Sequence, residues 1–234
     1  MITVYKAVRG EYTEKKSRFI ASLKYVASET EAEEFIASIK KEFYDARHNC
    51  SAYIITAEDG RVIKKSSDDG EPQGTAGHPM LDVLENQGIV NIAAVVTRYF
   101  GGTLLGTGGL VRSYTKALQD ALEKSTLIER KRGSELLIKT DYSMSGKLEY
   151  YLAGNNLAVS EKNYTENVEF KVIVPEESYD RVVKDINAMT SGRCVPELIK
   201  AVDFAVLGNE VLTGDRLVNE EKEIDLRYVS VKDK

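Results

Sequence analysis

Several residue types are scarce in this chain of 234 residues. It has only two cysteines, Cys50 and Cys194, which excludes a disulfide framework and a four-cysteine zinc site and suits a reducing compartment. No run approaches the ~20 apolar residues that a membrane helix needs. The first twenty residues contain no apolar segment of the kind that a signal peptide carries. We therefore expect a cytoplasmic protein with no membrane partner.

Excess positive charge is also missing, because the net charge is −5. This balance argues against a protein that binds nucleic acid over its whole surface. Residues 1–132 hold 19 Lys and Arg against 18 Asp and Glu, whereas residues 133–234 hold 13 against 19. An anion-binding face is therefore expected in the first half of the chain.

With 42% apolar and 29% charged residues, the chain can bury the cores of two domains. The apolar pattern predicts an α+β domain over residues 1–130 and a second over 134–207, joined by a charged linker, 129–134. In the second domain the expected strands are 135–142, 157–165, 168–174 and 198–207, and the expected helices are 145–153 and 176–190. This β-α-β-β-α-β order is that of the ferredoxin-like split motif. Residues 208–234 are expected to be a tail, in which Ile224, Leu226 and Tyr228 alternate as they would in one short strand.

In the first domain, strands are expected at 3–8, 19–26, 51–57, 62–66 and 89–96, with helices at 79–87 and 108–124. Ser28 and Glu31 have the spacing of a capping box at the start of a further helix. The Asp59-Gly60 pair predicts a hairpin between two of the strands.

The most informative segment is a glycine loop, residues 101–109, with five glycines in nine positions between a buried strand and a helix. Glycine permits close approach of a ligand, and the free N–H groups at a helix N-terminus favour an anion. The loop has neither the Lys-Ser/Thr ending of a Walker A motif nor the G-x-G-x-x-G spacing of a dinucleotide site. Arg112 lies in the first helical turn, so it is expected either to pair with a carboxylate or to bind an anion, and a tight packing loop is the alternative.

A second loop, the acidic loop 68–77, carries three carboxylates within four positions. Asp68, Asp69 and Glu71 could offer oxygen ligands to Mg²⁺. Ion pairing with Arg98 or Arg112 is the simpler use of these carboxylates.

His48 and Cys50 are two residues apart and would face the same way on a strand, as a dyad or half a metal site, although a polar strand end is the simpler interpretation. Lys15, Lys16 and Arg18 form a basic cluster whose simplest interpretation is a solvated strand edge. The candidate ligands for an anion or nucleic acid are Arg98, Gly101, Gly102, Gly106, Gly108, Gly109 and Arg112. The supporting loop residues are Asp68, Asp69, Gly70, Glu71, Gly74, Thr75 and Gly77, with Arg18, His48 and Cys50 as secondary candidates. No catalytic residue, cofactor or metal is predicted, and the sequence does not indicate an oligomeric state.

The stretches 16–19 (KSRF), 47–50 (RHNC), 68–77 and 97–112 (TRYFGGTLLGTGGLVR) resemble the IMPACT family in its bacterial, YigZ/YvyE-like branch. The resemblance covers roughly residues 15–125 by motif. It implies a first domain similar to the second domain of a small-subunit ribosomal protein, a GHMP-kinase-like superfold, and a ferredoxin-like second domain similar to one in an elongation factor. It also implies a role in translation regulation and stress response. Eukaryotic members compete for a partner of the amino-acid-starvation kinase through an added N-terminal domain. This chain, whose first strand is expected at residue 3, is not expected to have that domain, so that partner does not carry over.

Three functions follow as hypotheses. The first is a translation-linked regulator that binds RNA, the ribosome or another phosphate-bearing partner through the two loops. The second is a Mg²⁺-dependent enzyme acting on a nucleotide or small phosphorylated substrate, which lacks a recognisable nucleophile or base with an oriented partner. The third is a protein-interaction module that binds no nucleic acid.

Overall fold

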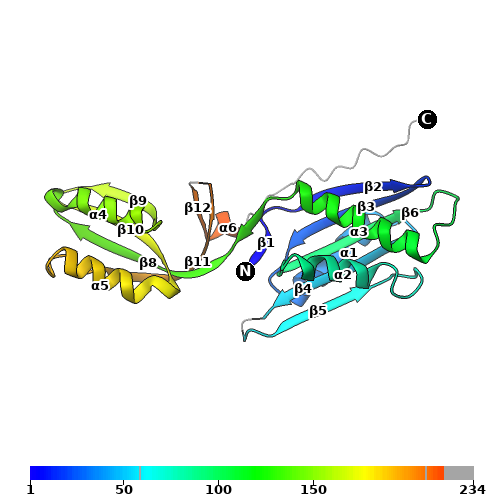
Figure 1. The fold of residues 1–234 in the computed structure, drawn as a ribbon, viewed down its shortest axis with the longest axis horizontal. Coiled ribbons are helices and arrows are strands. Elements are labelled where there is room, and N and C mark those ends of the chain that lie inside the picture. Colours follow the sequence, from blue (N-terminus) through cyan, green and yellow to red (C-terminus); the bar gives the residue numbers. More distant parts are fainter. Residues whose placement is uncertain (58, 209, 219–234) are drawn as a thin grey trace. The chain divides into compact units, whose positions relative to one another are not determined.

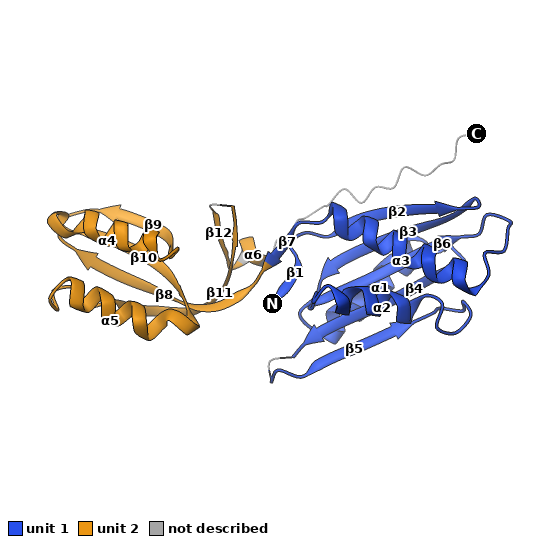
Figure 2. Ribbon diagram, in the orientation of Figure 1, with its two compact units in different colours: residues 1–128, 219–234 blue, residues 129–218 orange. Residues whose placement is uncertain are grey.

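The computed structural model describes residues 1–57, 59–208 and 210–218. These residues form two compact units, 1–128 and 129–218 (Figure 2). The elements of the first part of the chain are β1 (Ile2–Val4), β2 (Val8–Glu14), β3 (Ser17–Tyr25), α1 (Glu29–Glu42), β4 (His48–Thr56), β5 (Val62–Ser67), α2 (Gly77–Asn86), β6 (Ile92–Tyr99), α3 (Thr107–Lys124) and β7 (Leu127–Glu129). The second part holds β8 (Lys131–Thr140), α4 (Tyr142–Gly154), β9 (Ala158–Tyr164), β10 (Val168–Pro175), the 3-10 turn η1 (Glu176–Ser178), α5 (Tyr179–Met189), β11 (Glu197–Leu207), β12 (Glu210–Thr213) and α6 (Asp215–Val218).

The first unit is built on a five-stranded antiparallel sheet in the order β2-β3-β6-β4-β5, with β1 and β7 paired separately (Figure 1). The central strand, β6, is buried along seven of its eight positions. Its alternate side chains enter two different cores, so helices are needed on both faces. Ala94 and Val96 pack with α2 and α3, whereas Ala93 and Val95 pack with α1.

The start of α1 follows the predicted capping box. The Glu31 N–H donates to Ser28 Oγ at 3.2 Å, and the Glu31 carboxylate accepts from the N–H of Ala27 at 2.9 Å. The first bond satisfies an N–H group that the first helical turn cannot satisfy internally, and the second binds the residue before the N-cap to the helix. The predicted hairpin is also confirmed, since β4 pairs antiparallel with β5.

Strand β2 was missed by the sequence analysis, which expected a strand at 3–8 and no further strand before 19. Residues 8–14 mix half-buried and exposed positions without strict alternation. Gly10 lies so close to α3 that an added Cβ would stand 2.3 Å from the Ala121 backbone nitrogen. This glycine therefore permits close packing of the helix on the strand.

The second unit has the predicted β-α-β-β-α-β order over β8 to β11. Its sheet runs β12-β11-β8-β10-β9, and each neighbouring pair of strands is antiparallel. The buried, alternating side chains of β10, including Phe170 and Val172, pack with Leu148 and Leu152 of α4 and Val182 of α5.

Two boundaries differ from the prediction. The expected linker 129–134 is not a loop, because β8 begins at Lys131 and pairs with both β10 and β11. Its glycine was interpreted as a loop signal, but a Cβ at Gly133 would lie 2.6 Å from the Val174 carbonyl oxygen. The expected tail is not a tail from 208 onward, since β12 pairs with β11 and α6 follows it. The predicted strand around Ile224, Leu226 and Tyr228 lies outside the described residues. Among the described helices none combines the length and apolar character required to cross a membrane.

Candidate functional site

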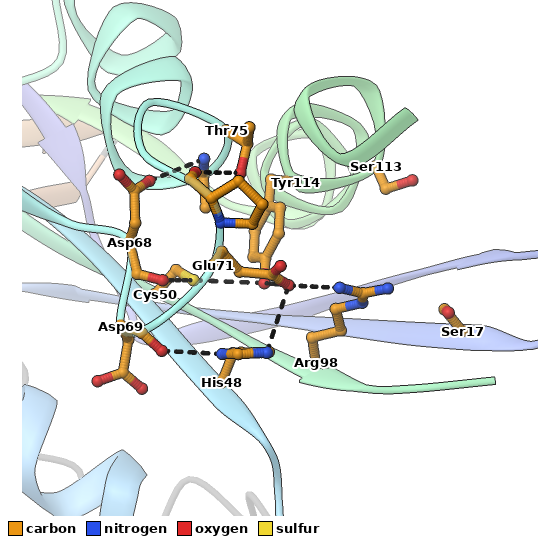
Figure 3. A network of polar contacts seen from close by, with 12 residues as sticks. Ser17, His48, Cys50, Asp68, Asp69, Glu71, Thr75, Arg98, Ser113 and Tyr114 are labelled. Atoms are coloured by element: carbon orange, nitrogen blue, oxygen red, sulfur yellow. Dashed lines mark hydrogen bonds and ion pairs between the residues drawn. The ribbon is translucent and has the colours of Figure 1, made fainter. Parts of the chain in front are cut away.

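The acidic loop begins with a carboxylate that organises the loop itself (Figure 3). Asp68 accepts hydrogen bonds from the backbone N–H groups of Gly74 at 2.7 Å, Ala76 at 2.9 Å and Gly77 at 2.8 Å. Burial on its own would raise the pKa of the Asp68 carboxyl, but these three donors outweigh it and the pKa is lowered. Asp68 therefore acts as the cap of α2, whose N-cap residue, Ala76, has no side-chain acceptor.

The second carboxylate fastens the loop to β4 and α1. Asp69 accepts from the Asn49 N–H at 2.7 Å and from Lys40 Nζ at 2.6 Å. Burial raises the pKa of Asp69, but Lys40 and the Asn49 N–H together bring it below its ordinary value. Asp69 and Gly70 have positive φ angles of 44° and 85°, which give the loop its sharp turn.

The third carboxylate is buried. Glu71 Oε1 lies 2.5 Å from Arg98 Nη1 and accepts from the Tyr114 hydroxyl at 2.9 Å. The side chains of Glu71 and Arg98 are only 3% and 7% exposed. Figure 3 shows the guanidinium directed at the carboxylate beneath Tyr114 of α3. The pairing of the acidic loop with Arg98, expected as the simpler use of its carboxylates, is thus confirmed for Glu71.

His48 and Cys50 project from β4 under the same loop but bond to its backbone. His48 Nδ1 is 2.8 Å from the Asp69 carbonyl oxygen, and the Cys50 thiol donates to the Asp68 carbonyl oxygen at 2.9 Å. Burial raises the pKa of the Cys50 thiol to about 12, with nearby carboxylates adding to the rise. Cys50 also lies 3.3 Å from the Tyr114 hydroxyl. A thiol that stays protonated is a poor nucleophile, so the dyad interpretation is not supported.

The glycine loop is seated on the turn between β2 and β3. A Cβ on Gly101 would stand 2.1 Å from the Lys16 carbonyl carbon, and the Gly101 N–H donates to Ser17 Oγ at 3.1 Å. Only glycine allows this approach. Gly102 and Gly106 have φ angles of 85° and 71°, which turn the chain into α3.

The helix that leaves the loop begins without a side-chain cap, because its N-cap residue is Gly106. The first N–H groups of a helix have no acceptor within it. A Cβ added at Gly108 would lie 3.5 Å from Arg112 Nη1, an ordinary contact, whereas one added at Gly109 would lie 3.0 Å from Leu105 Cβ. Leu104, at the loop tip, is 83% exposed.

The β2–β3 turn consists of Lys15 and Lys16, since Glu14 pairs with Ser17. Both lysines have positive φ, 46° and 66°, as a type I′ turn requires. Such turns favour Asn-Gly, and a left-handed conformation costs other residues about 1–2 kcal/mol each. Two lysines therefore occupy positions that the fold would fill more easily with other residues.

The two arginines predicted as ligands of one anion have different surroundings, because only Arg98 is paired with a carboxylate. Arg98 lies within β6, which extends to Tyr99 rather than ending at residue 96 as expected. This position places the Arg98 guanidinium in the buried ion pair with Glu71. Arg112 keeps its place in α3, and its guanidinium has no ion-pair partner among the described residues. Arg18, a secondary candidate, forms a two-bond pair with Glu11, at 2.5 and 2.7 Å. Of the predicted cationic ligands, Arg112 alone stays available.

Sequence reasoning missed Tyr114 as the link between Cys50 and Glu71, and it missed Lys116 near the glycine loop. Tyr114 lies on the core side of α3, where a tyrosine hydroxyl needs a buried partner, and that need was the available signal. Lys116 follows Arg112 by four residues, which places both on one helix face. Thr75, a predicted supporting residue, stabilises the acidic loop locally through a bond to the Pro72 carbonyl oxygen at 2.7 Å.

Two family models match the chain: the Impact N-terminal domain over residues 15–122 and a domain of unknown function, DUF1949, over residues 138–193. The IMPACT family member YvyE of Bacillus subtilis is 44% identical over 191 residues, which is 82% of this chain and 87% of that protein. A protein IMPACT homolog of Dictyostelium discoideum is 42% identical over 96 residues, which is 40% of this chain and 27% of that protein. A crystal structure described as that of a hypothetical protein aligns with a TM-score of 0.55 at 33% identity, covering 85% of this chain and 97% of its own.

Proposed function

Because this chain belongs to the IMPACT family, we propose that it is a translation-linked regulatory protein that binds RNA, the ribosome or another phosphate-bearing partner through its glycine loop. Eukaryotic members of the family are translational regulators. The translation link rests on this membership. The assignments to a GHMP-kinase-like superfold and a ferredoxin-like second domain stay predictions, as do the RNA partner, the cytoplasmic location and the role in stress response.

The observation that carries the binding part is a set of uncompensated cations around an exposed glycine loop. Lys15, Lys16 and Arg112 have no ion-pair partner within the described part of the chain. Gly101 packs directly on the β2–β3 turn that carries the two lysines. Helix α3 begins at the end of the glycine loop without a side-chain cap. Cations and free backbone N–H groups are the donors that proteins use for phosphate.

The acidic loop has a supporting role in this proposal. Its three carboxylates are each bound to donors of the protein itself, and these bonds fix the loop against β4, β6 and α3. The alternative of a Mg²⁺-dependent enzyme would need at least some of these oxygens free for the metal. The bonds therefore favour the regulatory protein over the enzyme.

Ribosome cosedimentation at graded salt tests the proposal. The double variant Lys16→Asn, Arg112→Ala should lose most of the binding, whereas Lys41→Ala should keep it. Lys41 is a suitable control because it is an exposed lysine of α1, on the opposite face of the sheet. The asparagine is chosen because it tolerates positive φ.

A wild-type protein that does not sediment with ribosomes and does not shift RNA would count against the proposal. Equal binding by the double variant would also count against it. A protein partner captured equally well after nuclease treatment, with no RNA bound, would favour the protein-interaction module instead.

A further inference from the structure

A small cleft lies between the β2–β3 turn and one face of α3. It has a volume of about 80 Å³, and Lys15, Arg112 and Lys116 lie in its wall together with Glu14, Tyr12 and Gly109. A volume of roughly 10–15 Å³ accommodates one water molecule, so the cleft has room for about five to eight. A phosphate group, with five heavy atoms, is of this size.

The charge of the cleft is strongly positive. It carries three cations and one carboxylate, a net charge of +2. The carboxylate, Glu14, already accepts a hydrogen bond from the Tyr12 hydroxyl at 2.8 Å. Lys116 approaches the same hydroxyl at 3.3 Å and lies over the Tyr12 ring at 4.9 Å. These contacts orient Lys116 without neutralising it.

The other two cations, the Lys15 ammonium and the Arg112 guanidinium, have no ion-pair partner in the part of the chain that the structure describes. The Arg112 side chain is exposed and is therefore accessible to a ligand in the cleft. Its position near the start of α3 is unfavourable for a cation, since the helix dipole is positive there.

The backbone provides a second, independent observation. Lys15 adopts a positive φ of 46° in a two-residue turn, where asparagine or glycine would be less strained. Strained residues that the surrounding structure keeps in place are concentrated at binding sites. The turn is rigidly placed, because Gly101 packs directly on the Lys16 carbonyl carbon.

We propose that this cleft binds a terminal phosphate monoester, with Lys15, Arg112 and Lys116 as its ligands. A monoester carries about −1.5 to −2 charges at pH 7 and so matches the net charge of the cleft, whereas a backbone diester carries one. The proposal rests on the proposed function and specifies it. The monoester belongs either to the end of an RNA or to a free nucleotide, and the test separates these two sources.

The first test is an NMR titration of the full chain with inorganic phosphate and with a nucleoside 5′-monophosphate. Both should shift the amide signals of Gly109 and Lys15. Arg112→Ala and Lys116→Gln should each weaken binding about tenfold, whereas Lys41→Ala should bind as the wild type does. Amide shifts confined to other regions, or equal binding by Arg112→Ala, would overturn the proposal.

A second variant separates binding from folding. The double variant Lys15→Asn, Lys16→Gly installs the preferred turn, so its melting temperature should rise by a few degrees while phosphate binding falls about tenfold. A more stable variant with unchanged phosphate binding would show that Lys15 is not a ligand and would overturn the proposal.

Short RNAs with a 5′-phosphate or a 5′-hydroxyl identify the source of the monoester. Tighter binding of the phosphorylated RNA, lost in Arg112→Ala, assigns the cleft to RNA ends. Equal binding of the two RNAs together with nucleotide binding assigns it to a free nucleotide. Equal RNA binding with neither phosphate nor nucleotide bound overturns the cleft proposal. Ribosome binding by the wild type in that case would leave the proposed function intact.

Discussion

The buried pair of Glu71 and Arg98 allows a sharp prediction about how the acidic loop is held. Replacing Glu71 by alanine leaves the Arg98 guanidinium without its carboxylate in a site where its side chain is 7% exposed. The Tyr114 hydroxyl also loses its acceptor. Removing one partner of a buried ion pair typically costs about 3–5 kcal/mol, and we expect the free energy of unfolding of the first unit to fall by that amount.

The same reasoning predicts a partial rescue. An apolar pair of similar volume, Glu71→Met with Arg98→Met, removes both buried charges together and should recover most of the lost stability. Glu71→Gln keeps an oxygen for Tyr114 while removing the charge, so its effect should lie between the wild type and Glu71→Ala. These three variants separate the cost of an unpaired charge from the cost of lost packing.

Native-state amide hydrogen exchange is the appropriate assay, because it measures the first unit within the full chain. Protection of the β6 amides should fall by roughly 10²- to 4 × 10³-fold in Glu71→Ala, since each 1.4 kcal/mol is a factor of ten. A loss below about 1 kcal/mol in Glu71→Ala, or a Met–Met variant less stable than Glu71→Ala, would refute the reasoning.

Three further predictions concern the loops and the thiol. Asp68→Ala should lower stability by about 1–2 kcal/mol at pH 7, because three N–H donors lose their acceptor. Since the folded pKa of Asp68 is below the ordinary 3.8, the advantage of the wild type should be complete above that pH and should vanish as pH falls through the folded value, as acid-titrated urea unfolding can measure. Gly101→Ala should cost about 1–3 kcal/mol through its contact with the Lys16 backbone. Gly108→Ala, where the added Cβ would only meet the flexible Arg112 guanidinium at 3.5 Å, should leave the melting temperature nearly unchanged or raise it, and equal effects of the two changes would contradict the close packing of Gly101 on the β2–β3 turn. Cys50 should resist thiol reagents at pH 8 in the folded protein, because with a pKa of about 12 only about 10⁻⁴ of the thiol is ionised, and rapid labelling detected by mass spectrometry would disprove this.

Much of the fold was predictable because most of its elements follow a regular apolar pattern. The capping box at Ser28 identified the start of α1, and the strand expected at 168–174 is β10. Failures came where tertiary contacts decide the structure. Gly10 and Gly133 permit close packing of a helix and a strand, which a local pattern cannot distinguish from a loop signal.

The sequence was sufficient to locate the segments that form the site, but not the ion pairs between their side chains. Both glycine-containing loops were found, yet the sequence could not show which arginine would pair with Glu71. That choice depends on the length of β6, which carries Arg98 into the core and leaves Arg112 on the helix. Lys15 was interpreted as a solvated strand edge, because its positive φ and its position beside α3 become visible only in the structure.

The salt dependence of RNA affinity tests the central claim most directly. A phosphate contact made by a lysine or arginine contributes about one unit to the slope of log affinity against log salt concentration. We predict that Arg112→Ala lowers this slope by about one relative to the wild type, and that Lys41→Ala leaves it unchanged. The same slope in the wild type and in Arg112→Ala would contradict the assignment of the glycine loop as a phosphate-binding face.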